Sequence, residues 1–292
     1  MRIAIYGKRF DQVFNGHCTK LFNSLADVEA ELYVFKPFYD FMTEQACLKT
    51  DVAGFFSDYN DLPDCDMLFS IGGDGTFLDA VTMVRERQIP IVGVNSGRLG
   101  FLADISKEEL PDAVNDIFEG RYEVRELDLL KLETKLPGFG DLDFALNELA
   151  VVKRDGSSMI TVHVKLNGEF LNSYWADGLI IATPTGSTAY SLSVGGPIIH
   201  PASKNLIINP IAPHNLTVRP LVVPNSFDLS LKVESRGGTF LASLDSRSCI
   251  LDDSVELRIR KADFSIPVVE RIGKTFYSTL RSKLMWGADK RN

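Results

Sequence analysis

The sequence predicts a Rossmann-like α/β domain and a β-sandwich-like domain, with a helical tail that packs back on the first domain. Residues 1–120 alternate short apolar runs with helical patterns, which is typical of a parallel sheet covered by helices. Residues 121–270 contain short strand-like runs separated by turn signals such as Asn167-Gly168, which is typical of an all-β domain. Residues 271–292 form the tail, in which Lys274 to Met285 has a helical pattern.

The individual elements follow from the same patterns. In the first domain, short apolar runs bounded by turn residues predict four strands, Arg2–Tyr6, Glu31–Phe35, Met67–Ile71 and Ile91–Val94. Apolar side chains at helical spacing predict two helices, Phe77–Arg87 and Ser106–Phe118. The strands expected in the second domain are Tyr122–Thr134, Phe144–Lys153, Met159–Leu166, Glu169–Trp175, Phe227–Glu234 and Ser254–Arg260.

The composition argues against several classes of function. A formal net charge of -8 argues against a sequence-independent nucleic-acid binder and, weakly, against a partner at an anionic membrane surface. No apolar run approaches the ~18 residues of a membrane-spanning helix, and Met1 to Gly7 is typical of a first strand rather than a signal peptide. The cysteines are scattered without a C-x-x-C pair, which favours reduced thiols in a cytoplasmic protein; they are Cys18, Cys47, Cys65 and Cys249.

A glycine-rich turn, Gly72-Gly73-Asp74-Gly75-Thr76, links an expected strand to an expected helix. Glycine lets backbone N–H groups approach an anion, and a helix N-terminus adds partial positive charge, so this turn suits a phosphate. Beside a phosphate, Asp74 must either bind a metal or accept a proton. The loop Asn95–Phe101 follows the next strand and is expected at the same sheet edge, which favours a cleft there. The alternative is an ordinary strand-to-helix turn without a ligand.

A second stretch, Asp177 to Pro201, contains no Lys or Arg and no acid other than Asp177. It is rich in glycine and hydroxyl side chains, which can bind a polar ligand without the cost of burying cationic side chains. The carboxylate at its start can bond a ribose hydroxyl, as acidic residues do in dinucleotide-binding folds. The alternative is a buried connection whose hydroxyls are satisfied internally.

These two stretches resemble the NAD kinase family. Its motifs are G-G-D-G-T, here Gly72 to Thr76, and D-G-L-I-x-x-T-P-T-G-S-T-A-Y-S-L-S-x-G-G-P, here Asp177 to Pro197. The pattern Asn95-x-Gly97-x-Leu99-Gly100-Phe101-Leu102 and the pair Asn147-Glu148 match the family in order and at similar spacing. Diacylglycerol and sphingosine kinases share the first motif, whereas the second is far more restricted. The resemblance covers essentially the whole chain.

The resemblance implies transfer of the terminal phosphoryl group of ATP to the 2′-hydroxyl of the adenosine ribose of NAD, with Asp74 as the proton acceptor. No clustered ligand set predicts a resident metal, so a divalent cation, Mg²⁺ or Mn²⁺, is expected to arrive with the nucleotide. The resemblance also assigns dinucleotide or nucleotide binding to a larger set of residues, namely Gly75, Asn147, Glu148, Asp177, Thr185, Thr188, Ala189, Tyr190, Ser191, Leu192, Ser193, Ala212, Asp245 and Arg247.

Within that set, the adenosine side falls to Asn147 and Glu148 and the nicotinamide side to Asp177. Many bacterial members carry an Arg two residues before the Asp-Gly pair, whereas this chain has Trp175, which can stack on a ligand or pack.

The resemblance implies a homodimer or homotetramer, in which the backbone near Ala212 of one subunit reaches the ligand of another. The apolar run around it suggests how the subunits meet. Ile207, Ile208 and Ile211 are expected to form an exposed edge, and such patches usually mark an interface.

Two alternative functions are compatible with the shared G-G-D-G-T motif. A lipid kinase needs a deep apolar slot or a membrane-facing patch, and the polar run Thr183–Ser193 argues against it. A non-catalytic NAD(P)-binding regulator has no need of a proton acceptor, and the presence of Asp74 in an intact glycine turn argues against it.

Overall fold

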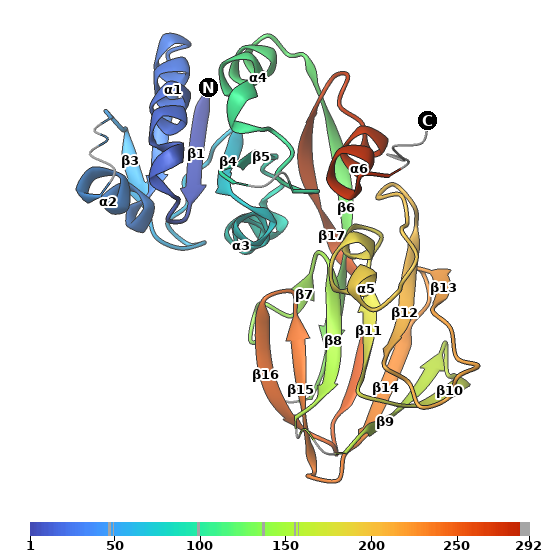
Figure 1. Ribbon diagram of the computed structural model, residues 1–292. Helices are drawn as coiled ribbons and strands as arrows, with labels where there is room; N and C mark the ends of the chain where they lie inside the picture. The colour runs from blue at the N-terminus through green and yellow to red at the C-terminus, as the bar shows by residue number, and fades with distance from the viewer. Residues whose placement is uncertain are drawn as a thin grey trace. The chain divides into compact units, whose positions relative to one another are not determined.

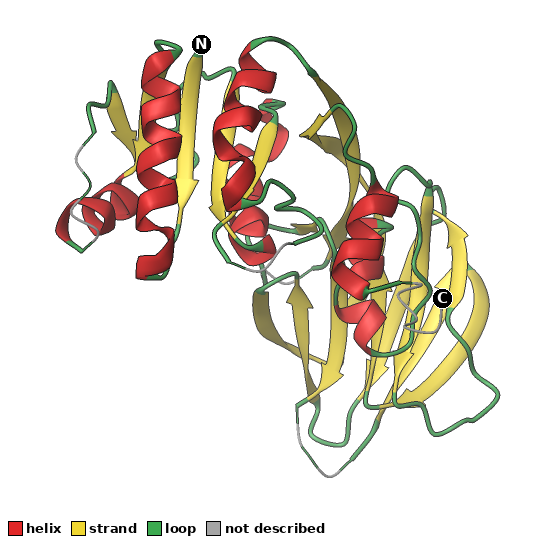
Figure 2. Cartoon of the chain, turned by 45° about the horizontal axis from the view of Figure 1, so that its top comes forward, coloured by secondary structure: helices red, strands yellow, loops and turns green. Residues whose placement is uncertain are grey.

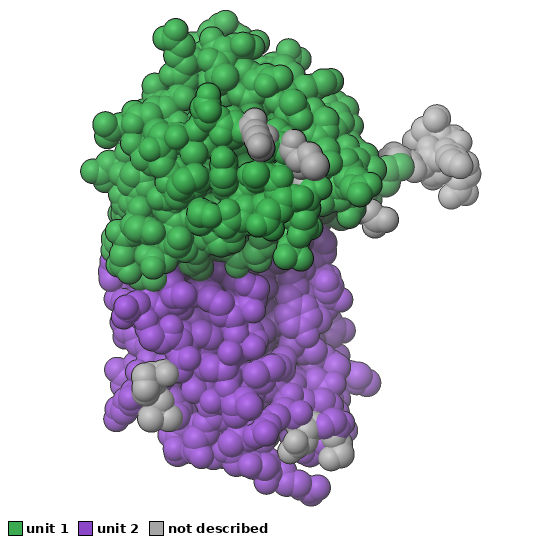
Figure 3. Space-filling view, turned by 90° about the vertical axis from the view of Figure 1, so that its left-hand side faces the viewer, with its two compact units in different colours: residues 1–126, 266–292 green, residues 127–265 purple. Residues whose placement is uncertain are grey.

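The structure is a computed structural model that describes residues 1–45, 48, 50–97, 100–135, 138–154, 156 and 158–286. Two residues named in the sequence patterns, Cys47 and Leu99, lie outside the described residues. The chain divides into two compact units, residues 1–126 with 266–292 and residues 127–265, which Figure 3 colours green and purple.

The first unit is built on a parallel sheet with the strand order β5-β4-β1-β2-β3 (Figure 1). All four pairings along it are parallel. The last part of β17 (Glu256–Arg271) lies beside β5 through the parallel pair Val268 and Ile91. The elements of this unit are β1 (Arg2–Gly7), η1 (Gln12–Phe14), α1 (Asn15–Asp27), β2 (Glu31–Phe35), α2 (Lys36–Glu44), β3 (Gly54–Phe56), β4 (Met67–Gly72), α3 (Asp74–Val84), η2 (Arg85–Arg87), β5 (Ile91–Asn95), η3 (Lys107–Glu109), α4 (Leu110–Phe118) and α6 (Phe276–Leu284).

Alternation along the strands decides which helix covers which face. Ile3 and Ile5 of β1 pack into one apolar cluster with the buried side chains of α1 and α4. Figure 2 shows these two helices side by side in front of the sheet. Ala4 of β1 and Leu68 of β4 are equally buried and point to the opposite face, since successive strand residues alternate. There α3 lies against β4 and β5.

The strand order reverses between β1 and β4. From β1 the chain moves outward to β2 and β3, and then returns to β4 on the other side of β1. In open α/β sheets such a reversal leaves a crevice at the carboxyl ends of the two strands, where ligands bind. Here those ends are Gly7 of β1 and Gly72 of β4, so the glycine-rich turn lies beside the crevice.

The second unit consists of two antiparallel sheets, which confirms the expected sandwich. One sheet has the order β13-β12-β11-β8-β15-β16, and the other contains β10-β9-β14-β17, with β6 paired to β17 and β7. β6 and β17 carry the chain between the two units. The remaining elements are β6 (Tyr122–Glu133), β7 (Phe144–Ala145), β8 (Glu148–Lys153), β9 (Ile160–Leu166), β10 (Glu169–Ala176), β11 (Gly178–Ala182), η4 (Thr185–Thr188), α5 (Tyr190–Ser193), β12 (Asn205–Ile211), β13 (Leu221–Pro224), β14 (Leu229–Glu234), β15 (Thr239–Leu244) and β16 (Arg247–Asp252).

The two faces of one sheet bury different surfaces. Leu179 and Ile181 of β11 face the large core shared by both sheets. Ile180 and Ala182 of the same strand face outward, where Val194 and Ile199 from the hydroxyl-rich stretch cover them. The stretch after β11 therefore lies over the outer face of this sheet.

Two expectations about the strands were wrong. The segment expected as one strand, Phe144–Lys153, is two strands, because the carboxylate of Asp245 accepts backbone N–H groups at the break between them. Ile207 and Ile208 are fully buried rather than exposed, because β12 is an interior strand with a covered outer face. Ile211 is partly buried.

Several strands of the structure were not expected from the sequence. β3, β11, β12, β13, β15 and β16 were not expected, although the four strands expected in the first domain are all present to within one residue. Among the described residues, no helix has the length and apolar character needed to cross a membrane.

Candidate functional site

The carboxylate of Asp74 is held by the backbone of the loop that follows β5. Asp74 is the first residue of α3, two residues after the end of β4. Its Oδ2 accepts the N–H of Phe101 at 2.9 Å, and its Oδ1 accepts the N–H groups of Leu102 and Ala103, each at 3.0 Å. Three fixed dipoles therefore set the position of one carboxylate.

The loop can come this close because Gly100 has no side chain. A Cβ at Gly100 would lie 1.9 Å from Asp74 Oδ1. Gly100 also donates its N–H to the carbonyl of Ala103 at 3.1 Å, and Ser96 donates to the carbonyl of Gly72 at 3.1 Å. These bonds join the loop to the end of β4. The side chain of Asp74 nevertheless stays 30% exposed and can reach a ligand.

The backbone beside Asp74 is also accessible. A Cβ at Gly75 would meet no atom of the described residues within 4 Å. The first N–H groups of a helix have no partner inside the helix, and they carry partial positive charge. The start of α3 is therefore suited to an anion, as the glycine-rich turn predicted.

The first unit supplies cations around this edge. Lys8, which follows β1, forms an ion pair with Asp79 of α3. A pocket of about 540 Å³ lies at the ends of β1 and β2 and is lined in part by Lys8, Arg9, Phe35 and Phe38. The same pocket is also lined by Asp40 and Glu44, so its walls carry charges of both signs.

One residue of this site was not found from the sequence. Lys283 of α6 places its Nζ 3.5 Å from Asp74 Oδ2 and 4.7 Å from the centre of the Phe101 ring. The two partners of this ion pair lie 209 positions apart in the chain. The only available signals were the helical pattern of the tail and its expected return to the first domain.

In the second unit, a buried carboxylate organises the break between β7 and β8. Asp245 accepts the N–H groups of Leu146, Asn147 and Glu148 at 3.0, 2.8 and 3.2 Å. Arg247 lies 3.7 Å from Asp245 and also donates to the carbonyls of Leu142, at 2.6 Å, and of Phe144. Asp245 and Arg247 thus hold the pair Asn147-Glu148 in place.

Two buried oxygen atoms in this pair have no hydrogen-bond partner among the described residues. They are Asn147 Oδ1 and Glu148 Oε2. Leaving such atoms unpaired costs free energy, so buried polar atoms normally find a partner. Their orientation therefore indicates a ligand or an ordered water at this place.

Burial raises the pKa of Glu148 to about 8, with a smaller contribution from the neighbouring Asp245, while a hydrogen bond from the backbone of Tyr190 opposes the shift. The pKa of Asp245 is also raised by burial, against the effect of the N–H groups it accepts. Burial therefore favours the protonated form of Glu148.

The hydroxyl-rich stretch packs tightly against the same pair. Thr183 accepts the N–H of Gly186 at 3.1 Å and donates to the carbonyl of Leu146 at 2.5 Å. A Cβ at Gly186 would lie 2.2 Å from the carbonyl oxygen of Asn147, so only glycine allows this approach. The hydroxyl-rich stretch and the pair Asn147-Glu148 are therefore in direct contact and form one cluster.

The remaining predicted residues of this stretch differ in exposure. Ser191 is buried and accepts the side-chain amide of Asn209 at 3.1 Å, and Thr185 is also buried. Part of the set is accessible to a ligand and comprises Thr188, Ala189, Tyr190, Leu192 and Ser193. The accessible side chains, rather than the buried hydroxyls, are the ones that can line a groove.

Asp177 lies apart from the cluster formed by the hydroxyl-rich stretch and the pair Asn147-Glu148, and it already forms an ion pair. Lys153 donates to its carboxylate at 2.6 Å. Trp175, two residues earlier, is half-exposed and packs on His214, with 4.3 Å between the ring centres. Ala212 is exposed and adopts a positive φ of 44°, which is strained for a residue with a side chain.

The structure thus divides the predicted residues between the two units. Asp74 and Gly75 belong to the first unit, and the other predicted residues belong to the second. In the described parts of the chain, no group of three or more His, Cys, Asp or Glu side chains is placed to hold a metal ion. Asp74 already accepts three N–H groups, so it is a poor resident ligand for a cation.

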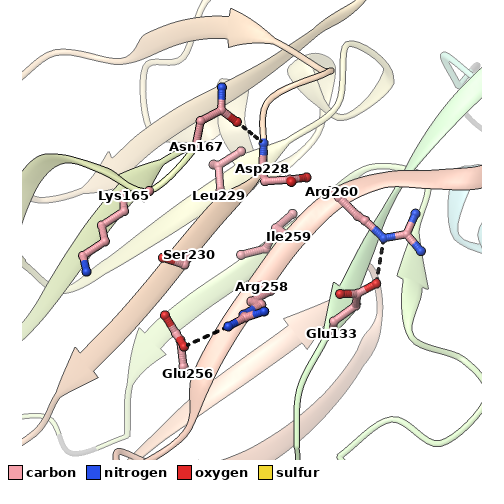
Figure 4. Close-up of a pocket in the computed structure, with 11 residues that line it drawn as sticks. Glu133, Lys165, Asn167, Asp228, Leu229, Ser230, Glu256, Arg258, Ile259 and Arg260 are labelled. Carbon is pink, nitrogen blue, oxygen red and sulfur yellow. Dashed lines mark hydrogen bonds and ion pairs between the residues drawn. The ribbon is translucent and has the colours of Figure 1, made fainter.

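Another pocket, of about 530 Å³, lies on the outer face of the second sheet in this unit (Figure 4). Its walls carry charges of both signs, including Arg260 paired with Glu133 at 2.7 Å and Arg258 paired with Glu256 at 3.8 Å. A slot for acyl chains needs apolar walls, and this pocket does not provide them.

The raised pKa of Glu148 leads to a prediction for stability. Its pKa is about 8 in the folded chain, against 4.5 for a free side chain, so between these pH values the folded state holds a proton that the unfolded state has released. The wild-type protein therefore loses stability as pH rises from about 4.5 to about 8. Glutamine stays neutral, so Glu148→Gln should match the wild type near pH 4.5 and exceed it by up to about 4–5 kcal/mol at pH 8.5, which corresponds to the rise of the Glu148 pKa from 4.5 to about 8.

Calorimetric unfolding curves from pH 4.5 to 9 measure this difference, with Glu169→Gln on the exposed face of β10 as the control. A difference between Glu148→Gln and the wild type that stays constant with pH would contradict the prediction.

The comparisons with known proteins agree with this geometry. The ATP-NAD kinase N-terminal domain model matches residues 41–122, and the ATP-NAD kinase C-terminal domain model matches residues 146–271. The chain is 47% identical over 292 residues to an NAD kinase of Cytophaga hutchinsonii and 46% identical over 291 residues to one of Bacteroides fragilis. Each alignment covers 100% of both chains. These relatives give no support to a lipid kinase or to a regulator.

Two solved structures are similar over almost the whole chain. An NAD kinase from Archaeoglobus fulgidus in complex with ATP has a TM-score of 0.76 at 27% identity, covering 98% of this chain and 99% of that one. A yeast NADH kinase complexed with NADH shares the fold, with a TM-score of 0.85 at 23% identity, covering 99% of this chain and 89% of that one. The chain therefore belongs to the NAD kinase family.

Proposed function

We propose that Asp74 is the proton acceptor of this chain's reaction, in which the terminal phosphoryl group of ATP passes to the 2′-hydroxyl of the adenosine ribose of NAD. The observation that carries this role is the arrangement of three backbone N–H groups around the carboxylate. These N–H groups are fixed by the fold, so they orient the carboxylate without the reorganisation of dipoles that solvating water would undergo during the reaction.

The hydrogen bonds also distinguish the two carboxylate oxygens. A carboxylate has about four lone-pair sites, two on each oxygen. Oδ1 accepts two N–H groups, whereas Oδ2 accepts one and lies 3.5 Å from Lys283. Oδ2 is therefore the oxygen with capacity for the proton of the hydroxyl.

The reaction then balances as follows. The 2′-oxygen forms a bond to the γ-phosphorus while the bond from that phosphorus to the β,γ-bridging oxygen breaks. The electron pair of the broken bond leaves with ADP, and the hydroxyl proton passes to Asp74 Oδ2. Phosphoryl transfer needs positioning and charge neutralisation rather than covalent catalysis, so one base and a phosphate site are sufficient.

We place the triphosphate at the carboxyl edge of the parallel sheet. Three features support this position: the reversal of strand order between β1 and β4, the N-terminus of α3, and Lys8 at the end of β1. A divalent cation, Mg²⁺ or Mn²⁺, enters with the triphosphate and supplies further charge neutralisation. Mg²⁺ commonly binds through substrate phosphates and keeps several waters, so it needs no protein cage.

The dinucleotide is assigned to the second unit, within the β-sandwich-like region of residues 121–270. The unpartnered oxygens of Asn147 and Glu148 support contacts with the adenosine side of NAD. Asp177 supports the nicotinamide side, and a ligand there would compete with Lys153 for its carboxylate. The accessible residues of the run Thr188 to Ser193 are assigned to the dinucleotide groove, and Asp245 and Arg247 are assigned to holding the pair Asn147-Glu148.

We further propose a cytoplasmic homodimer or homotetramer. The apolar edge expected at Ile207 and Ile208 is buried, so another surface must supply the contact. The edge strands β10 and β13 expose Phe170, Trp175 and Val222. Exposed apolar side chains on unpaired strand edges support association with another subunit.

The direct test of the function is an assay of the purified protein with NAD and magnesium ATP, in which NADP is detected enzymatically. We expect NADP to form at a rate that depends on the protein concentration. EDTA should abolish its formation, and excess Mg²⁺ or Mn²⁺ should restore it. Formation of no NADP from magnesium ATP would contradict the proposed reaction, and full activity after exhaustive chelation would contradict the role of the cation.

The role of Asp74 predicts that Asp74→Asn lowers kcat by about 10²–10⁴-fold, because an amide of similar size cannot accept the proton and its NH2 group replaces an oxygen that accepts a backbone N–H. The affinity for NAD should change little, since the dinucleotide is assigned to the other unit. Stopped assays and calorimetric NAD titrations measure the two quantities. A variant that keeps a tenth of the wild-type turnover would show that Asp74 is not the base.

The close approach of the loop predicts a similar loss without any change at the base itself. In Gly100→Ala the new methyl group would overlap Asp74 Oδ1, so we expect kcat to fall by at least about 10²-fold as the carboxylate is displaced. Gly97→Ala is the matched control, because a Cβ there meets no described atom within 4 Å. Equal kcat values for the two variants would contradict the proposed constraint.

A further inference from the structure

Lys283 contacts the proposed base without being needed to hold the fold. Its Nζ lies 3.5 Å from Asp74 Oδ2, beyond the usual range of a charge-assisted hydrogen bond. Both side chains are about one-third exposed, at 31% and 30%. Ion pairs as open to solvent as this one contribute little to stability, so stability does not explain the contact.

The helix that carries Lys283 is anchored by other groups. Thr275 caps α6 by accepting the N–H of Ser278 at 3.1 Å. The ring of Phe276 lies 6.3 Å from that of Phe101, and Lys274 pairs with Glu109 at 2.7 Å. These contacts keep the end of the tail against the loop that binds Asp74, whether or not Lys283 carries a charge.

The proposed reaction, on which this inference rests, needs a positive charge near Asp74, and the ammonium group of Lys283 lies there. A γ-phosphoryl group transferred to a hydroxyl that Asp74 deprotonates must come close to that carboxylate, and two anions in proximity repel each other. The lysine stem has four rotatable carbons, so its Nζ can move by several ångströms while the helix stays in place.

We infer that Lys283 is a further catalytic residue, which leaves Asp74 Oδ2 when the triphosphate binds and moves to a γ-phosphoryl oxygen. This movement neutralises charge between the phosphate and the base. It also frees Oδ2 to accept the proton of the 2′-hydroxyl. In the ligand-free protein the same ammonium group keeps the carboxylate paired.

The test compares Lys283→Met, Lys283→Arg and the control Arg281→Met. Arg281 is exposed on the same helix, and two residues correspond to a rotation of about 200°, so it points away from the position of Lys283. Calorimetry with the magnesium complex of β,γ-imido-ATP measures triphosphate affinity without turnover. Separate measurements give the affinity for NAD, kcat and the midpoint of thermal unfolding.

We expect Lys283→Met to bind the analogue about 10-fold more weakly and to lose about 10²-fold in kcat, as when one donor to a developing charge is removed. NAD affinity and the unfolding midpoint should stay near the wild-type values. Lys283→Arg should recover most of both losses, and Arg281→Met should behave like the wild type. The loss in analogue affinity should persist in an Asp74→Asn background, because the contact is with the phosphate.

Two results would overturn the inference. One is analogue affinity within twofold of the wild type in Lys283→Met. The other is a loss that disappears in the Asp74→Asn background, which would show that Lys283 acts only on the carboxylate. Failure of the proposed reaction would be seen separately, as absence of NADP formation by the wild-type protein, while the analogue titrations would still report on Lys283.

Discussion

The first unit depends on the contact between one carboxylate and three consecutive backbone N–H groups. Asp74 starts α3, and the groups it accepts belong to the loop after β5, so the contact joins two neighbouring strand ends of the parallel sheet. Because β4 and β5 are held in register by their own ladder, the carboxylate and the loop approach each other at a fixed distance. The reactive group is thereby positioned by the sheet rather than by flexible side chains.

In the second unit a carboxylate is also held by three backbone N–H groups of a distant segment, but this carboxylate is buried. There the carboxylate of Asp245 accepts the backbone N–H groups of Leu146, Asn147 and Glu148 and so fixes the break between β7 and β8, where Asn147 lies directly before the first residue of β8. The cost of burying the carboxylate of Asp245 is offset by the backbone N–H groups that it accepts, and the oxygens Asn147 Oδ1 and Glu148 Oε2 have no partner among the described residues.

Much of the architecture could be predicted from the sequence, and the limits have physical causes. Local patterns were sufficient for the strand–turn–helix around Asp74, since the apolar run, the glycines and the helical spacing are all contiguous. They were insufficient for Lys283, because nothing near it in the sequence indicates which distant loop its helix will meet. The burial of Ile207 was missed because it depends on a covering segment that is rich in hydroxyl side chains, and that of Ile208 because it depends on the distant strands that complete the core between the sheets. The contacts of Asp245 with the backbone were not predicted, because its partners lie almost 100 positions away.

The use of backbone rather than side-chain donors around Asp74 has a consequence for how this chain can vary. A mutation changes side chains, and every residue except proline supplies the same N–H group. The three positions that bind the carboxylate can therefore exchange their side chains, within the limits of the surrounding packing, without altering the dipoles that face it. Gly100 has no such freedom, since any added carbon enters the space of the carboxylate itself. At positions 101–103 it is therefore packing that limits which side chains are allowed, as for Phe101 against Phe276 and for the buried Leu102 and Ala103, whereas at Gly100 the contact with the carboxylate itself excludes every side chain.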